Sequence, residues 1–524
     1  MKFKTITRTS WPIQPEPDTI YLEIDNWNDH SFVTMFRLHY CDLDGHKMDL
    51  GVVKIGFKGQ TVEQYTYSTF PPEFSRLSEG YFSVGQDVKF YSRMGILSDG
   101  MGQKILGALR DIVLNPEIVD EIASEKVLNI SLLRDVSLSL VKGQFARALH
   151  GSADRTSFIF RFQRPETEKQ GGIQLDFSVQ VDTVPSTNIH AVIGRNGVGK
   201  TTLLNGMIDA VTKRPHLSRF FNLASGPIAE IGSEYFSALV SVSFSAFDPF
   251  NPPKEQADPA KGTCYFYIGL KDSLESDRHK TIPDLRADCA RSLTGCFRNA
   301  AKTRRWLHAI EKLGSDENFA AIQLNILHSA YLDLKSRIPN IQADSEPFFQ
   351  QYKNEVDLYL SRMSSGHAIV LLTITRLVET VQEKTLVLLD EPESHLHPPL
   401  LSAFIRALSD LLHDQNGVAI IATHSPVVLQ EIPRSSVWKI YRTGKQVSAA
   451  RPQIETFAEN VGVLTSEVFS LEVARSGFHD LLEKSVEMGA TYEGILNEYG
   501  HQLGVEGRAI LAALTTERDM RIVK

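Results

Sequence analysis

The sequence predicts an α/β protein built around a phosphate-binding core, with a β-rich N-terminal region, a helical insertion and a helical C-terminal tail. Three observations lead to this expectation. An apolar segment, a glycine-rich turn and a helix-like segment follow one another at 189–207. A second short apolar segment at 384–391 ends in two acidic residues, Asp390 and Glu391. Apolar and polar side chains alternate over 20–60, as expected of strands with one buried face.

Length and composition indicate an ordinary globular chain. Its 524 residues carry a net charge of −8, so nucleic-acid binding would need a local basic surface. The N-terminus lacks the apolar segment of a signal peptide, and no segment reaches the ~18 apolar residues that span a bilayer. We therefore expect a cytoplasmic protein that is not embedded in a membrane. Scattered cysteines without CxxC spacing favour free buried thiols: Cys41, Cys264, Cys289 and Cys296.

Composition and periodicity divide the chain into five expected regions. The tail has seven basic and twelve acidic residues, so it is a poor candidate for gripping DNA. Its apolar periodicity suits either docking of a protein or packing on the core. Asp44-Gly45 is a hairpin turn signal in the first region. The regions are a β-rich one at 1–125, a lobe with the glycine-rich turn at 126–262, a helical insertion at 263–360, a second lobe at 361–450 and the helical tail at 451–524.

The glycine-rich turn matches the phosphate-loop pattern GxxxxGK[ST] in full and lies between a strand and a helix. Glycines let backbone N–H groups surround a phosphate, and the N-terminal end of the helix favours the anion. We expect Lys200 to reach the β- and γ-phosphates of ATP and the Thr201 hydroxyl to ligate Mg²⁺. The expected nucleotide-binding residues here are Gly194, Arg195, Asn196, Gly197, Val198, Gly199, Lys200, Thr201 and Thr202.

Two later strands supply candidate catalytic groups. A buried strand that ends in an acid delivers a carboxylate to the metal, so we assign Asp390 to Mg²⁺ and Glu391 to the attacking water as general base. The strand at 417–426 ends in His424, which can donate to the γ-phosphate. His395 and His397 form an HxH pair that can ligate zinc, but a turn that crosses to a partner subunit fits this run better.

Ser364, Ser365, Gly366 and His367 precede a long apolar helix. Serine hydroxyls and the free N–H groups of a helix start make a second phosphate cradle. In this chain order, one chain cannot direct both cradles at the same γ-phosphate. The second cradle must therefore come from another subunit, which predicts a homodimer or a higher even oligomer.

Together these segments resemble the ABC-type ATPases over roughly 155–205 and 360–440. There are two departures from that family. His367 stands where transporters carry Gln, and the Q-loop glutamine is missing near 240–250, where Ser245 or Asp248 would face the Mg²⁺ side instead; slow hydrolysis is the expected result. The resemblance implies a Walker A motif at Gly194–Thr201, a signature motif at Ser364–His367, a Walker B motif with its glutamate at Asp390-Glu391, a D-loop at Ser394–Leu396 and a switch histidine at His424.

Among soluble ABC ATPases, the chain has neither the long heptad arms of SMC-like proteins nor the Toprim acids of OLD-like proteins, nor an HNH-type site. The segments 82–95 and 457–482 are similar to the flanks of PtuA-type ATPases of Septu antiphage systems, which also occur as retron effectors. That resemblance implies an HNH nuclease subunit as a partner. In a retron it further implies a reverse transcriptase with its DNA–RNA hybrid.

A rival function is the clamping of DNA, as in repair or chromosome ATPases. The segment 281–313 holds seven basic and three acidic residues, with Phe297 and Trp306 among them. A helix with these charges either follows a phosphate backbone or is a solvated face. A transporter ATPase is a third alternative, without a membrane anchor to support it. The residues expected to contact DNA are Arg298, Lys302, Arg304 and Arg305.

Overall fold

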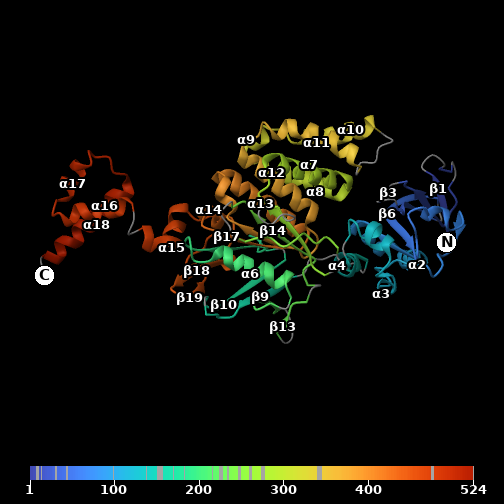
Figure 1. Ribbon diagram of the computed structural model, residues 1–524, viewed down its shortest axis with the longest axis horizontal. Helices are drawn as coiled ribbons and strands as arrows, with labels where there is room; N and C mark the ends of the chain where they lie inside the picture. The colour runs from blue at the N-terminus through green and yellow to red at the C-terminus, as the bar shows by residue number, and fades with distance from the viewer. Residues whose placement is uncertain are drawn as a thin grey trace.

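The computed structural model places three packed parts in a row, with the N-terminal unit and the last three helices at opposite ends (Figure 1). None of the helices in the described residues combines the length and apolar character that crossing a bilayer requires. The structure describes residues 1–522 apart from 8–10, 13–14, 27, 30–31, 43–44, 98–99, 137, 150–156, 169, 182, 215, 224–227, 233–234, 246–249, 259–261, 273–277, 339–344 and 474–476.

The N-terminal unit is a six-stranded sheet in the order β7-β1-β2-β5-β6-β8, in which β1 and β2 run parallel and the other pairs antiparallel. The strands expected from the alternation over 20–60 are confirmed as β2, β5 and β6. Asp44 of the expected hairpin turn lies outside the described residues. The bounds are β1 Lys2–Thr7, β2 Thr19–Ile24, β5 Met35–Cys41, β6 Lys47–Phe57, β7 Glu73–Phe74 and β8 Tyr81–Gly85, with a small pair β3 Asn28–Asp29 and β4 Phe32–Val33.

Helices cover this sheet and extend the unit beyond its expected end at residue 125. Side chains from Val127 to Leu149 pack into the same core as Phe3 and Phe82. The boundary predicted at residue 125 is therefore wrong, because the unit extends to Leu149. The reason is that the segment after residue 125 is itself apolar and short, and it buries its side chains against the sheet. The helices are α1 Val88–Ile96, α2 Met101–Ala108, α3 Ile118–Ile122, α4 Leu138–Leu140 and α5 Ala146–Leu149.

The central part is built on a seven-stranded sheet in the order β15-β14-β16-β17-β11-β18-β19, parallel except for β19. All residues of β11 are buried, as expected of a parallel strand covered on both faces. β15 lies in the segment assigned to the helical insertion, so the insertion proper begins only at α7. The strands are β11 Ile189–Ile193, β14 Ala238–Ser243, β15 Cys264–Gly269, β16 Leu386–Asp390, β17 Val418–Thr423, β18 Val437–Thr443 and β19 Gln446–Ala450.

The two faces of this sheet carry different layers. On one face lies α6 (Lys200–Thr212), whose Leu203 and Met207 share a core with a four-stranded antiparallel sheet, β10-β9-β12-β13. On the other face lies the helical lobe, whose core includes Val370 and Ile374 of α12 (Ser365–Thr380). The small sheet comprises β9 Phe158–Arg164, β10 Ile173–Val179, β12 Arg219–Asn222 and β13 Ala229–Glu230.

The helical lobe uses the aromatic residues of the basic segment as core. Trp306 is fully buried, and its indole N–H donates to Thr375 Oγ1 at 2.9 Å; Phe297 packs edge-on against it. These rings are therefore not available for stacking on bases. The helices are α7 Ile282–Arg298, α8 Ala300–Leu313, α9 Glu317–Ala320, α10 Asn325–Arg337, α11 Glu346–Leu360, α12, α13 Pro398–Asp414 and α14 Pro426–Gln430.

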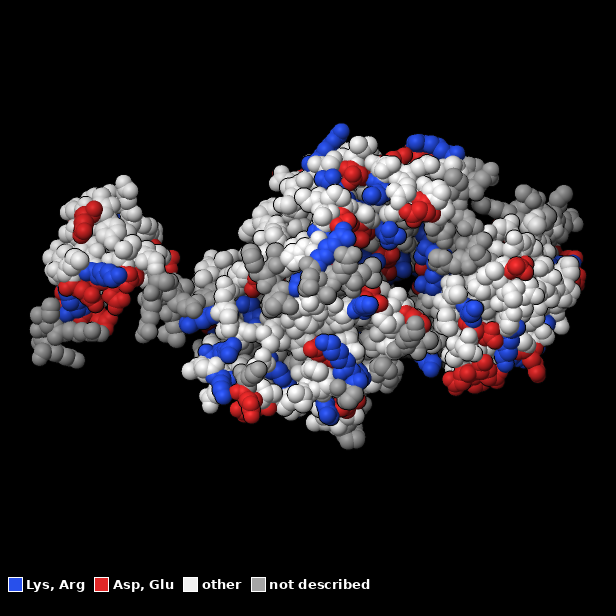
Figure 2. Space-filling model, in the orientation of Figure 1, with Lys and Arg blue, Asp and Glu red and all other residues white. Residues whose placement is uncertain are grey.

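The expected basic DNA-binding face is wrong for three of its four residues. Arg298 and Lys302 approach Asp135 of the N-terminal unit at 3.2 and 3.9 Å and are largely buried, and Arg305 donates to the carbonyl of Val381. Only Arg304 of the four is mostly exposed, at 57%. Figure 2 shows basic and acidic side chains together in the hollow between the N-terminal unit and the helical lobe, whose lining includes Lys302, Arg304 and Arg305. The basic segment therefore joins the helical lobe to the N-terminal unit, because the N-terminal unit supplies the carboxylate of Asp135 that faces Arg298 and Lys302.

The C-terminal tail is helical, as expected. α15 (Val461–Val473) lies against α14, and Glu467 binds the Lys439 ammonium of β18 at 2.7 Å. The last helices form a separate small core around Leu482, Ile495 and Leu511. They are α16 Phe478–Glu487, α17 Tyr492–Glu498 and α18 Val505–Ile522. The four cysteines elsewhere in the chain are buried free thiols, also as expected.

Candidate nucleotide-binding site

The phosphate loop joins the end of β11 to the start of α6, as the sequence predicts. Gly197 and Gly199 have φ values of 79° and 99°, which side chains rarely tolerate. A Cβ on Gly194 would lie 2.6 Å from the carbonyl oxygen of Ile440, so only glycine fits there. Lys200 is buried, and its Nζ donates to the carbonyls of Gly194 at 3.0 Å and Arg195 at 3.2 Å. The loop is thus closed around its own lysine, whose ammonium is held by two backbone carbonyl oxygens.

Glu391 is held in a strained position beside this lysine. Its φ of 45° is left-handed, a conformation that costs a non-glycine residue about 1–3 kcal/mol. The neighbouring strand fixes it, since the Glu391 N–H donates to the carbonyl of Ala422 on β17 at 2.9 Å. Its carboxylate lies 3.8 Å from Lys200 Nζ. The structure therefore brings together two of the predicted catalytic residues that are 191 positions apart in the sequence.

His424 reaches the same place from the end of β17. Its Nδ1 lies 3.6 Å from Glu391 Oε1 and 3.2 Å from Glu393 Oε1. Glu393 also accepts the His424 N–H at 2.8 Å and the Thr423 hydroxyl at 2.6 Å. Sequence reasoning missed Glu393, although its side chain fixes the histidine loop. The signal available was its place in the turn η6 (Pro392–His395), two residues after the predicted base.

The predicted Mg²⁺ ligands lie at the carboxyl edge of the same sheet. Asp390 ends β16, in register with Ser243 of β14 and Ala422 of β17, and Thr201 is the second residue of α6. A carboxylate and a hydroxyl are oxygen donors of the kind that Mg²⁺ prefers, so these residues fit the ion. Of the proposed Q-loop substitutes, Ser245 is exposed and Asp248 lies outside the described residues.

A buried lysine lies near this metal position and was not predicted. Lys271, just after β15, lines a small cavity together with Asp390, Ser243 and Tyr267. Its Nζ donates to the carbonyl of Phe250. The segment after β15 therefore places a positive charge in the cavity beside Asp390, and the only sequence signal for it was a lysine shortly after an apolar strand.

The signature segment opens α12, where Ser364 is the N-cap residue. Its Oγ accepts the His367 N–H at 3.3 Å and lies 2.8 Å from His367 Nδ1. A Cβ on Gly366 would lie 2.5 Å from the carbonyl oxygen of His395, so this glycine lets the helix start contact η6. α12 packs on the sheet face opposite to α6, and the two cradles thus belong to different layers of one chain.

The zinc alternative finds no ligand set in the described part of the chain. There, no three His, Cys, Asp or Glu side chains group in a way that could hold a metal ion. His397 instead pairs with Asp316 of the helical lobe at 2.9 Å.

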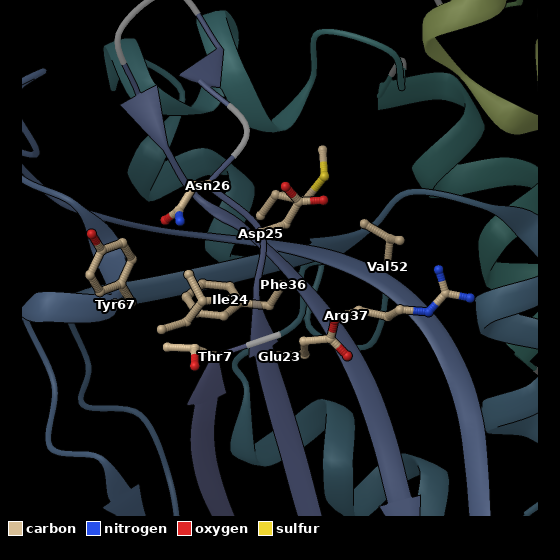
Figure 3. A pocket seen from close by; sticks show the side chains of 10 residues that line it. Thr7, Glu23, Ile24, Asp25, Asn26, Phe36, Arg37, Val52 and Tyr67 are labelled. Atoms are coloured by element: carbon tan, nitrogen blue, oxygen red, sulfur yellow. The ribbon is translucent and has the colours of Figure 1, made fainter. Parts of the chain in front are cut away.

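A further hollow lies in the N-terminal unit, lined by Glu23, Asp25, Arg37 and Tyr67 among others (Figure 3). Two of its charged side chains are engaged by neighbours within the unit. Arg37 pairs with Asp49, and Glu23 lies 3.0 Å from His39 Nε2. This hollow contains none of the residues predicted for the nucleotide site.

Comparison with known proteins places the chain in a family. The family described as "AAA domain, putative AbiEii toxin, Type IV TA system" matches residues 292–430. Among solved structures, MJ1267, an ATP-binding cassette of an ABC transporter in its ADP conformation, is 12% identical with a TM-score of 0.31, covering 62% of this chain and 100% of that chain. UvrA2 from Deinococcus radiodurans is 14% identical with a TM-score of 0.29, covering 62% of this chain and 42% of that chain.

Protein ea59 of Escherichia phage lambda is 52% identical over 520 residues, which is 99% of each chain. With half of its residues identical over nearly its whole length, the chain belongs to the protein family of phage lambda ea59.

Proposed function

We propose that the protein is an ATPase that dimerises around ATP and Mg²⁺, each copy giving its phosphate loop to one nucleotide and its signature segment to the other. The observation that carries the proposal is the convergence of three side chains at the carboxyl edge of a parallel sheet: Lys200 Nζ and His424 Nδ1 lie 3.8 and 3.6 Å from the Glu391 carboxylate. The separation of α6 and α12 by that sheet supports sharing of each site between two copies.

Each residue has a role in this scheme. Lys200 exchanges two loop carbonyls for phosphate oxygens, and Glu391 takes a proton from the attacking water. His424, oriented by Glu393, donates toward the γ-phosphate. Thr201 and Asp390 would hold Mg²⁺, which when bound neutralises the charge on the phosphates. The missing glutamine, with Lys271 nearby, favours slow turnover.

We further propose that the nucleotide state controls a partner protein. The resemblance to PtuA-type ATPases makes an HNH nuclease in antiphage defence the partner to test, together with a reverse transcriptase and its hybrid in a retron. The separate C-terminal helices support a docking role, since they expose Phe478, Leu481 and Met488 at 45%, 55% and 85%. The DNA-clamp alternative has lost most of its expected surface, because Arg298 and Lys302 bind Asp135.

The test of the ATPase is Glu391→Gln, which removes the base and keeps the shape. Hydrolysis should fall about 10²–10⁴-fold, and a dimer should accumulate with ATP and Mg²⁺ in size-exclusion chromatography with light scattering. Glu121→Gln is the matched control, since Glu121 pairs with Lys58 on the surface of the N-terminal unit. Unchanged turnover and an unchanged oligomeric state in Glu391→Gln would show that the assignment is wrong.

The partner is tested by purification of the tagged chain from its native operon in the presence of ATP. Mass spectrometry and nucleic-acid gels identify what is retained. A small HNH protein, with or without a reverse transcriptase and its hybrid, supports the defence function. A chain that arrives only with duplex DNA favours the clamp, and one that arrives with a membrane protein favours a transporter.

A further inference from the structure

Asp316 is a buried carboxylate that links the signature segment to the start of α13. Its side chain is 4% exposed, and Oδ1 accepts the N–H of Phe319 at 2.9 Å as the N-cap of α9. Oδ2 lies 2.9 Å from His397 Nε2, and Oδ1 lies 3.9 Å from His367 Nε2. Burial opposes ionisation of Asp316, but the hydrogen bonds from Phe319 and His397 and the nearby His367 outweigh it and lower its pKa. Asp316 is thus an anion between two histidines.

Whether the Ser364 hydroxyl donates or accepts a hydrogen bond at His367 depends on which ring nitrogens of His367 carry a proton. An anion opposite Nε2 favours the proton on that nitrogen, which leaves Nδ1 as an acceptor. The hydroxyl, 2.8 Å from Nδ1, then donates its only proton to the ring. In this form Ser364 has no proton left to donate to a phosphate.

We propose that Asp316 is a positioning residue that lets His367 take up a proton when the dimer closes on ATP. This inference rests on the proposed function, because Ser364 meets a γ-phosphate only in the dimer. One proton moves from solvent to Nδ1 of His367, and no covalent bond between heavy atoms changes. The ring then donates from Nε2 toward Asp316 and from Nδ1 to Ser364 Oγ, which turns the hydroxyl proton toward the phosphate of the other copy.

The surroundings of His367 suit this uptake. Its Nε2 is buried and has no hydrogen-bond partner among the described residues, so a shift of about 1 Å toward Asp316 would supply one. Phe319 covers the ring, with centroids 5.8 Å apart. The charged and titratable groups on the elements beside this end of α12 include Asp316 and Glu317 at the start of α9, Glu393, His395 and His397 around η6, and Arg362 just before the N-cap. A glutamine, which transporters carry here, cannot gain this charge.

The test is the pH dependence of dimerisation. Dimerisation of the Glu391→Gln protein with ATP and Mg²⁺ is measured by analytical ultracentrifugation between pH 6 and 9. Each copy takes up one proton, so closure of the dimer takes up two and the association constant should fall by up to about a hundredfold per pH unit. Adding His367→Gln should keep the dimer and remove this slope, whereas adding Asp316→Asn should move it to lower pH. His46→Gln is the control, since His46 is 81% exposed in the N-terminal unit and should leave the slope unchanged.

The outcomes separate the two proposals. A protein that forms no dimer at any pH, with either residue at position 367, refutes the ATP-dependent dimer itself. A dimer whose pH slope is the same with His and Gln at 367 overturns proton uptake and leaves the dimer standing. Thermal melting identifies an Asp316→Asn protein that does not fold. His397→Gln, which leaves Asp316 facing His367, then serves as the second variant and should retain the slope.

Discussion

Replacing Asp135 by asparagine should weaken the attachment of the N-terminal unit to the helical lobe. Asp135 is 14% exposed and lies 3.2 Å from Arg298 and 3.9 Å from Lys302, which are 17% and 9% exposed. Burial opposes ionisation of Asp135, but Arg298, Lys302, Lys54 and Arg134 outweigh it and hold its pKa far below the usual value. The substitution leaves these cations facing one another without an anion.

The expected magnitude follows from burial. Breaking a buried ion pair by removing one partner costs about 3–5 kcal/mol, because the remaining charge is left unpaired. Asp87→Asn is the matched control on the same surface, since Asp87 is 36% exposed and lies 3.7 Å from the exposed Arg304. An exposed pair of this kind contributes about 0–1 kcal/mol.

The assay is urea unfolding followed by circular dichroism and by the fluorescence of the buried Trp306 of the lobe, in a background where the other three tryptophans, Trp11, Trp27 and Trp438, are replaced by phenylalanine. Asp135→Asn should lower the stability and separate the two signals into distinct transitions, since each part has its own core. Asp87→Asn should leave the curves nearly unchanged. Equal effects of the two substitutions would refute the argument that the Asp135 contact joins the two parts.

Two further predictions concern the core and the signature segment. Burial lowers the pKa of His190 on β11 to about 3. The unfolded chain therefore binds this proton first, and stability is lost as pH falls from about 6.5 toward 3, by about 1.4 kcal/mol per pH unit. His190→Phe should remove this part of the pH dependence in thermal unfolding; an unchanged slope would contradict the assignment. Gly366→Ala places a Cβ 2.5 Å from the His395 carbonyl oxygen and should cost about 1–3 kcal/mol and weaken the ATP-dependent dimer. Gly504→Ala, which meets open space, is its control, and equal effects would contradict the close contact.

The parts of the site that could be predicted from the sequence are those determined by residues close together along the chain. The glycine-rich turn at Gly194–Thr201 needs left-handed backbone and a following helix, and both needs are visible within a dozen residues. The strands that end in Asp390 and Thr423 are short and apolar up to their last residue, as expected of neighbouring parallel strands, and this placement puts Glu391 and His424 at one edge of the sheet. The order of these motifs along the chain then indicated the resemblance to ABC-type ATPases.

The parts that could not be predicted depend on partners distant in sequence. A run of basic residues has the same appearance whether solvent or a carboxylate faces it, and the carboxylate of Asp135 lies 163 positions from Arg298. Asp316 is 81 positions from His397, and nothing in either local pattern marks the pair. The extent of the N-terminal unit was misjudged for the same reason, because a short apolar helix fits any nearby core.

The helix α12 has a mechanical consequence. It is 16 residues long, about 24 Å, and has no proline or glycine after Gly366, so it moves as one rod. Its first turn carries Ser364, while just beyond its last turn Val381 accepts a bond from Arg305 and Glu383 accepts the Gln144 N–H of the N-terminal unit. A rod fixed at both ends cannot tilt at one end alone. A displacement of the N-terminal unit would therefore be transmitted along α12 to the segment that carries Ser364.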